Sequence, residues 1–243
     1  MRLIISVSFA FLCFSGCALF TETKSTLPQT SKLLLTDNFS GYYDVSGRII
    51  FKHPEGKQNG EFLMQISSIS EMKLRIFAPV VGSLIYELRV DPEKFLVLNY
   101  QGKNFVLKEN SREVRQNLLG MDFSLDELRW LITGRLPKKS NSWKRKKHPT
   151  GELQLTQKTT EIRIRYNSFG HIESMKKFRE EILEYKAKIF EYQNANENIF
   201  PKKIQIEDYT GSNLWMMYII ELNAVSGSMK KLEFNPPAGL DPL

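Results

Sequence analysis

YYDVSGRIIFKHPEGKQNGEFLMQIS, residues 42–67, is the stretch of sequence that decides the fold. In its first half, apolar or small side chains occupy every second position from Tyr43 to Phe51. Polar and charged side chains, among them Asp44 and Arg48, occupy most of the positions between. Because successive side chains of a strand point to opposite faces of a sheet, this alternation predicts a strand with one buried face.

The alternation continues on both sides of this stretch, which predicts a series of mostly antiparallel strands. A turn is predicted at residues 53–60, rich in Pro, Gly and Asn. The strands that follow it are predicted around Phe62–Ile66, Leu74–Ile76, Leu84–Val90, Phe95–Asn99 and Phe105–Lys108, and the later ones around Gly151–Gln157, Glu161–Tyr166, His171–Phe178, Lys203–Glu207 and Leu214–Ala224. Residues 180–192 fit a strand or a helix. The pattern predicts about ten or eleven strands, enough to make a sheet curl.

Two short helices are predicted within this series of strands. Ser111 and Ser124 are suitable N-cap residues, and Gly134 is well placed to end the second helix. Helices inserted between strands indicate a lid over one face of the sheet. The predicted fold class is mainly β: an incomplete antiparallel barrel, or curled sheet, whose short helices form a lid over an apolar cavity.

The N-terminus has the pattern of a lipoprotein signal peptide. Arg2 precedes an apolar run, and the small residues Ser15 and Gly16 lead into Cys17. An ordinary signal peptide that contains a cysteine is the alternative. We expect a signal peptide at 1–16, a lipidated tether at 17–38 with the lipid on Cys17, a folded domain at 39–234 and an irregular tail at 235–243. Ala18 favours anchoring in the outer membrane over the inner membrane.

The sequence contains no pattern typical of an enzyme. Its three histidines have no partners at metal-ligand spacing, and there is no nucleophile elbow or phosphate-binding loop. We therefore expect no enzymatic activity, no metal and no cofactor. The formal net charge of +7 favours anionic partners. Nucleic acid is not expected among them, because the predicted signal peptide directs the protein out of the cytoplasm. A basic stretch at 137–149 fits either a site for anionic lipid or a solvated loop.

Two valines stand where a polar turn is expected. Ala78-Pro79-Val80-Val81-Gly82 joins two predicted strands, and Val80 and Val81 occupy its tip. Exposed apolar residues at such a place indicate insertion into an apolar partner. The alternative is that the loop folds back onto the core.

Several of these segments resemble the LolB family of outer-membrane lipoproteins. The resemblance rests on Leu74–Ser83, Leu118–Gly120 and Ser124–Pro137, and more loosely on Phe200–Asp208. It implies an incomplete barrel with a helical lid, a cavity for the acyl chains of a cargo lipoprotein, and a protruding loop that delivers the cargo to the membrane. On this resemblance the loop is formed by Val80 and Val81. The basic stretch and residues 176–198 have no clear counterpart in the family.

The resemblance also implies partners and cavity residues. The partners are a periplasmic carrier of the LolA type, the acyl chains of cargo lipoproteins, and outer-membrane lipid on the periplasmic side. The predicted cavity walls are Ile49, Phe51, Phe62, Met64, Ile66, Leu128, Trp130 and Leu131. For each of them, ordinary core packing is the alternative. The rival function is a lipoprotein of the same fold that binds another amphiphile or acts as an envelope assembly partner.

Overall fold

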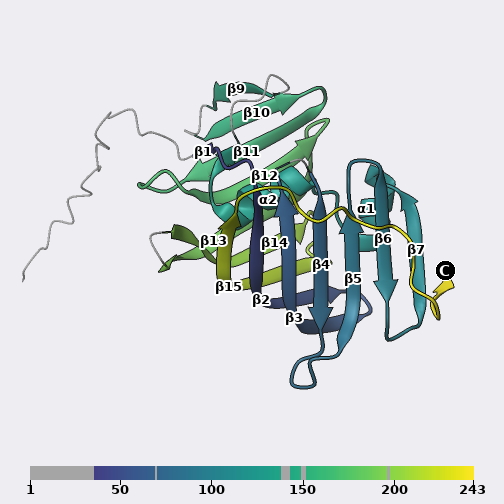
Figure 1. The fold of residues 1–243 in the computed structure, drawn as a ribbon. Helices are drawn as coiled ribbons and strands as arrows, with labels where there is room; N and C mark the ends of the chain where they lie inside the picture. The colour runs from purple at the N-terminus through teal and green to yellow at the C-terminus, as the bar shows by residue number, and fades with distance from the viewer. Residues whose placement is uncertain (1–35, 69, 138–142, 149–151, 196–197) are drawn as a thin grey trace, which may run out of the picture. The chain divides into compact units, whose positions relative to one another are not determined.

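Fourteen strands form one curled sheet, and two short helices lie on its concave side (Figure 1). The computed structural model describes residues 36–68, 70–137, 143–148, 152–195 and 198–243. Residues 32–243 form one compact unit. Cys17, the predicted signal peptide and residues 138–142 of the basic stretch lie outside the described residues, so the lipidation of Cys17 stays a prediction.

The elements follow the chain in a simple order. The helices are α1 (Arg112–Leu119) and α2 (Leu125–Thr133). The strands before them are β1 (Thr36–Asp37), β2 (Tyr42–His53), β3 (Gly56–Ser67), β4 (Met72–Phe77), β5 (Leu84–Val90), β6 (Lys94–Asn99) and β7 (Asn104–Glu109). The strands after them are β8 (Leu136–Pro137), β9 (Lys144–Lys147), β10 (Leu153–Gln157), β11 (Thr160–Tyr166), β12 (Ile172–Arg179), β13 (Ile182–Ala195), β14 (Asn198–Asp208), β15 (Leu214–Val225) and β16 (Asp241–Pro242).

The main sheet is antiparallel except at one edge, and it does not close. Its strand order is β16-β7-β6-β5-β4-β3-β2-β15-β14-β13-β12-β11-β10-β9, with β16 parallel to β7. In the described part of the chain, the end strands β9 and β16 do not pair with each other. The predicted fold class is therefore confirmed. The structure has more strands than predicted because short ones, such as the two-residue β16, contain too few residues to show alternation.

One local detail differs from the sequence prediction, and a second decides between two predicted alternatives. The predicted turn at 53–60 is much shorter, because His53 pairs with Gly56 across a two-residue turn and β3 begins at once. Residues 182–195 form a strand that pairs on both sides, with β12 and with β14. Their burial alternates as in a strand: Tyr185, Ala187 and Ile189 are buried, and the residues between them are less so.

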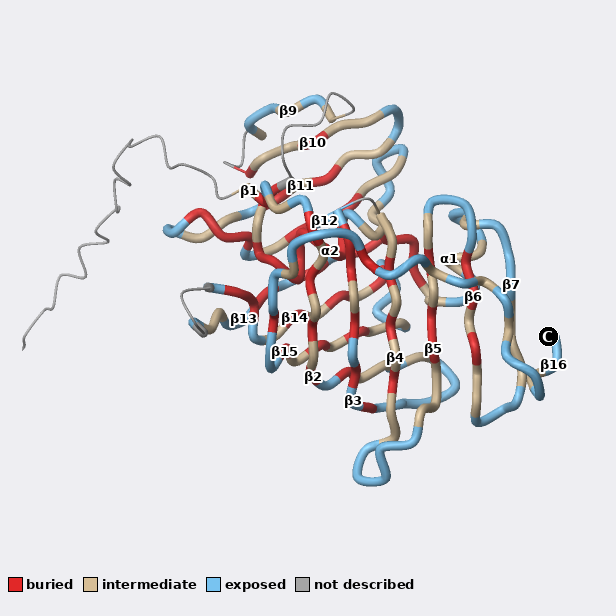
Figure 2. The backbone as a smooth tube through the Cα atoms, viewed as in Figure 1, coloured by how far each residue is buried: buried red, intermediate tan, exposed pale blue. Residues whose placement is uncertain are grey.

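The hydrophobic core fills much of the concave side of the sheet. In β3, for example, Phe62, Met64 and Ile66 are at most 1 % exposed, as the alternation predicts (Figure 2). Leu96 and Leu98 of β6 are also fully buried, although their neighbour Phe95 belongs to the concave core. They therefore bury a second, convex face of the same strand.

A C-terminal segment crosses the convex face of the sheet. After β15 the chain runs over β2–β6 and ends beside β7 (Figure 1). Arg89 of β5 donates a hydrogen bond to the carbonyl of Glu233, and the amide of Leu243 donates to Phe105 over 2.9 Å. Within the predicted irregular tail, Asp241–Pro242 form the short parallel strand β16. The segment occupies the edge of β7 that would otherwise be unpaired.

Candidate functional site

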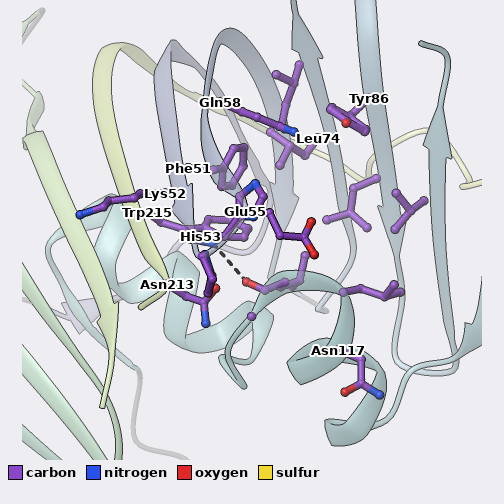
Figure 3. A pocket seen from close by; sticks show the side chains of 17 residues that line it. Phe51, Lys52, His53, Glu55, Gln58, Leu74, Tyr86, Asn117, Asn213 and Trp215 are labelled. Carbon is purple, nitrogen blue, oxygen red and sulfur yellow. Dashed lines mark hydrogen bonds between the residues drawn. The ribbon is translucent and has the colours of Figure 1, made fainter. Parts of the chain in front are cut away.

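A cavity of about 470 Å³ lies between the concave side of the sheet and helix α1 (Figure 3). Its lining is mainly apolar, with several polar side chains. The apolar lining includes Phe51, Leu74, Ile76, Tyr86, Leu88, Val97, Leu118, Leu119 and Trp215, and the polar lining includes Lys52, His53, Glu55, Gln58, Asn117 and Asn213. A mainly apolar cavity lined by a few polar groups suits an amphiphilic ligand.

A second cavity, of about 280 Å³, adjoins the first. Leu88, Leu119 and Trp215 line both. The indole of Trp215 is packed edge-on against Phe51 at 4.5 Å and against Phe123 at 5.0 Å between ring centroids. Phe51 lines the first cavity and Phe123 the second, so Trp215 forms the wall between them.

Helix α1 covers these cavities, and its Val114 and Leu119 pack against the core while staying partly exposed. The side chain of Ser111 accepts a hydrogen bond from the amide of Val114, and Gly120 ends the helix in the left-handed conformation that favours glycine. None of its eight residues, all within the described range, is buried. At its C-terminal end, the Trp215 indole N–H donates to the carbonyl of Leu119 over 3.2 Å (Figure 3). The helix is thus a lid held by its ends.

A buried network of charges holds the segment that follows the lid. Lys177 of β12 is 4 % exposed, and its ammonium donates to the backbone carbonyl of Asp122 over 2.8 Å. The same ammonium lies 3.4 Å from the Asp122 carboxylate and 3.2 Å from that of Glu127. Arg115 of α1 also pairs with Asp122, at 2.7 Å. One lysine of the sheet therefore fixes the connection between the two helices.

The electrostatics of this network follow from its burial. Burial alone raises the pKa of Asp122, but the nearby Lys177 and Arg115 outweigh it and hold the pKa below its ordinary value. Burial and the neighbouring Glu127 raise the pKa of Tyr185 well above its ordinary value. The Tyr185 hydroxyl therefore stays protonated and donates to Glu127 over 2.9 Å.

Helix α2 is built in the opposite way. Ser124 and Glu127 form a capping box, and seven of the nine residues of α2 are buried. The guanidinium of Arg129 donates to the carboxylate of Asp37 over 2.6 Å, which ties the helix to β1. α2 also packs against β14. Helix α2 therefore packs into the concave side of the sheet and forms part of the core.

The loop between β4 and β5 projects from the sheet with two exposed valines (Figure 2). Val80 is 104 % exposed and Val81 is 79 % exposed. Val80 has a φ of 74°, and the amide of Val81 donates to the carbonyl of Pro79 over 2.9 Å, which makes a tight three-residue turn. A β-branched residue in this conformation is strained. The loop does not fold back onto the core.

A family model described as "Outer membrane lipoprotein LolB" matches residues 42–217, more than half of the 243-residue sequence. The chain belongs to the LolB family. The match begins at β2. It includes both helices, the strands that line the two cavities and the Val80 loop. No curated protein matches the chain.

Solved structures show the same fold at low sequence identity. A LolA superfamily protein from Nitrosomonas europaea is 10 % identical with a TM-score of 0.53, over 81 % of this chain and 91 % of that one. A putative outer membrane lipoprotein-sorting protein domain from Vibrio parahaemolyticus is 10 % identical with a TM-score of 0.50, over 82 % and 91 %. A DUF1329 family protein from Desulfovibrio piger is 8 % identical with a TM-score of 0.52, over 79 % and 88 %.

The predicted cavity residues of this LolB-family chain divide into two groups. Phe51 lines the larger cavity. The other seven are buried in the core, and none of them belongs to the described lining of either cavity: Ile49, Phe62, Met64, Ile66, Leu128, Trp130 and Leu131. Contact between these seven and a cargo stays a prediction. Trp215 and Leu88 line both cavities but were not among the predicted cavity residues. Leu88 belongs to a strand that was predicted from its alternation.

A metal site is absent from the described residues. They contain no cluster of His, Cys, Asp and Glu suited to a metal ion. In the same described residues, no helix has the length and apolar character needed to span a bilayer.

Proposed function

We propose that this LolB-family protein is anchored to the outer membrane through lipid on Cys17 and faces the periplasm. It accepts lipoproteins from a periplasmic carrier of the LolA type and delivers them into the membrane. The acyl chains of the cargo occupy the two adjoining cavities under α1. Its function is binding and transfer, without catalysis. The observation that carries the proposal is an apolar hollow covered by a lid of which no described residue is buried.

The driving force for transfer is burial of the acyl chains. Each buried methylene contributes about 0.8 kcal/mol, so a small difference in fit between two cavities, summed over the chains, sets the direction of transfer. Entry requires α1 to move away from the core, which it contacts through the partly exposed Val114 and Leu119 and through the ion pair of Arg115 with Asp122. The main contact to be broken at the cavity wall is the hydrogen bond from Trp215 to Leu119.

The uptake step can be tested by filling the larger cavity. Val97 lines it from β6, and Val97→Phe would place a ring in the space assigned to acyl chains. We expect this variant to take up less labelled lipoprotein from a loaded LolA-type carrier, measured with an untethered form that begins at Ala18. The control is Leu107→Phe on the neighbouring strand, where the side chain is 41 % exposed. Equal uptake by the two folded variants would contradict the role of the cavity.

The delivery step is assigned to the loop of Val80 and Val81. Both side chains are exposed and free to enter a bilayer. Replacing both valines by Glu should leave uptake from the carrier unchanged and impair release of the cargo into vesicles. Normal release of cargo by this variant would show that the two valines are not needed for delivery.

A second candidate function is suggested by the polar side chains that line the cavity. His53, Glu55 and Gln58 come from β2, β3 and the turn between them, and Asn117 and Asn213 come from α1 and the turn before β15 (Figure 3). These groups can form hydrogen bonds with the head group of an amphiphile other than a lipoprotein. The alternative function is therefore the binding of such an amphiphile, or a role in envelope assembly. Mass spectrometry of ligands that copurify with the protein separates the candidates. A bound amphiphile other than a lipoprotein, together with no uptake from the carrier, would favour the second.

A further inference from the structure

Strands β9 to β13 lie next to one another at one end of the sheet, in the order β9-β10-β11-β12-β13. The basic stretch contributes β9, and residues 176–198 contribute much of β12 and β13. Cross-strand pairing places one residue of each strand in a continuous row. That row runs Lys146, Gln154, Arg163, Lys176 and Lys186, from β9 to β13. Four cations therefore stand on five neighbouring strands, interrupted by a single amide.

The lysines of this row face away from the core. Met175 and Ala187, which neighbour Lys176 and Lys186 in sequence, point into the core, so the lysines point outward. Together with Lys188 they line a shallow groove of about 210 Å³. Lys186 pairs with a carboxylate, Glu207, at 3.2 Å. In the described part of the chain, Lys176 and Lys188 form no ion pair.

Aromatic side chains extend the same surface. Phe190 is 43 % exposed, and the ammonium groups of Lys188 and Lys203 lie 4.9 Å and 4.8 Å from its ring centre. Lys203 also lies 5.5 Å from the ring centre of Tyr218. We refer to the surface formed by Arg163, Lys176, Lys186, Lys188, Phe190 and Lys203 as the basic face.

The arrangement has an energetic cost in the free protein. Arg163 is the direct cross-strand partner of Lys176, and Lys176 that of Lys186. Arg163 pairs with Glu161 and Lys186 with Glu207, so Lys176 is the one of these three cations that has no carboxylate partner among the described residues. Like charges placed directly opposite each other destabilise a sheet. An anionic partner would remove this repulsion, and the groove leaves room for its negatively charged groups.

We propose that the basic face binds the anionic head groups of a bilayer. Lysine is depleted in protein–protein interfaces, and this surface has four lysines to one arginine, which favours lipid over an acidic protein. Lysines close to exposed aromatic rings are typical of a membrane surface, where each cation contributes independently. The residues of the basic face line neither acyl-chain cavity, so the inference goes beyond cargo transfer and does not depend on it.

The test compares two variants with the same loss of charge. In the first, Lys176, Lys186 and Lys188 are replaced by Gln; in the second, the exposed Lys108, Lys230 and Lys231 are replaced. Both are made in the untethered form beginning at Ala18, which contains the whole compact unit. Binding is measured to vesicles of phosphatidylcholine and phosphatidylglycerol in equal amounts, and to vesicles of phosphatidylcholine alone.

We expect the first variant to bind the anionic vesicles on the order of a hundredfold more weakly than the second, and both to bind the neutral vesicles alike. The difference should disappear at about 1 M salt, where charges are screened beyond about 3 Å. The first variant should be about as stable to denaturant as the wild type, because relieved repulsion offsets the loss of the ion pair between Lys186 and Glu207.

Equal binding of both variants to anionic vesicles would overturn the proposal. It would also be overturned if the first variant kept vesicle binding but lost binding to the LolA-type carrier, which would make the basic face a protein-docking surface. Cargo uptake by both variants is measured without vesicles. If neither variant takes up cargo, the result contradicts the proposed function but does not bear on lipid binding by the basic face.

Discussion

The two helices of this protein lie on the same sheet and differ by one residue in length, yet one is buried and the other is not. In α2, seven residues are buried, and Arg129 anchors the helix to Asp37. In α1, no residue of the described helix is buried, and the space beneath it remains open. Both have a serine N-cap and a glycine at the C-terminal end. Helix capping therefore does not distinguish a lid from a buried helix.

The difference lies in what each helix presents to the sheet. α2 presents Leu128, Leu131 and Ile132, which are at most 1 % exposed and complete the core. α1 presents Val114 and Leu119, which pack against the core but stay partly exposed, and contacts at its ends hold it in addition. A sheet can thus combine a rigid region and an openable region when one helix fills the hollow and the other only covers it.

The largest effect is expected from removing the cation that links the two regions. Lys177→Met would leave the buried carboxylate of Glu127 without a cation, while Asp122 keeps Arg115 and Arg179. An uncompensated buried charge costs about 3–5 kcal/mol in the free energy of unfolding. The control is Lys186→Met, an exposed pair partner of Glu207 whose loss should cost less than about 1 kcal/mol. Urea unfolding measures both. A small loss for Lys177→Met would mean that the network does not hold the helices.

The comparison of the helices can be tested directly with two leucines. Leu131→Ala in α2 removes a side chain with 0 % exposure and should cost about 2–5 kcal/mol. Leu118→Ala in α1 removes one with 39 % exposure and should cost about 0.5 kcal/mol or less. Both are measured by urea unfolding. Similar losses would show that α1 is packed as firmly as α2.

The stability of the connection between the helices should depend on pH in acid. The pKa of Asp122 is lower in the folded protein than its ordinary value of 3.8, so folding favours its charged form. Its contribution is present above the ordinary pKa and is lost as the pH falls through the folded pKa. In Asp122→Asn, the free energy of unfolding should be lower than in the wild type at neutral pH, and the gap should narrow below about pH 4. A constant gap across this range would assign the effect to lost packing or hydrogen bonds.

The smallest effect is expected at the exposed tip of the open region. Val80→Gly removes a β-branched side chain from a left-handed conformation and should stabilise the protein by about 1 kcal/mol. The same change removes an apolar group from the loop, so release of cargo into vesicles should weaken. A thermal melt and the release assay measure the two effects. A variant that gains stability and releases cargo normally would show that the Val80 side chain has no role in delivery.

Much of the fold follows from local patterns. Alternation in β2 and β3 identifies the buried face of each strand, and Ser111, Ser124 and Gly134 mark helix ends that the structure confirms. The turn at Pro54 was predicted too long, because polar side chains such as Gln58 suggest a loop even when they lie at the end of a strand. Composition alone does not separate an exposed strand end from a turn.

The site is less predictable because it depends on contacts between distant residues. Alternation shows that Phe51 and Ile49 share a face, but only packing shows that Phe51 borders a cavity while Ile49 is enclosed in the core. The partners Lys177 and Asp122 are 55 positions apart, and a lysine within a strand has no local feature that predicts burial. The Val80 loop was identifiable because its signal, two valines at a turn, is local.

Trp215 gives this protein an optical probe of its own. Its indole borders both cavities and bonds to the last residue of the lid, whereas Trp130 and Trp143 pack against each other. A ligand entering either cavity changes the polarity around the same chromophore, and movement of the lid breaks the hydrogen bond of its N–H. The wavelength of the protein's fluorescence therefore reports filling and opening together, without any attached label.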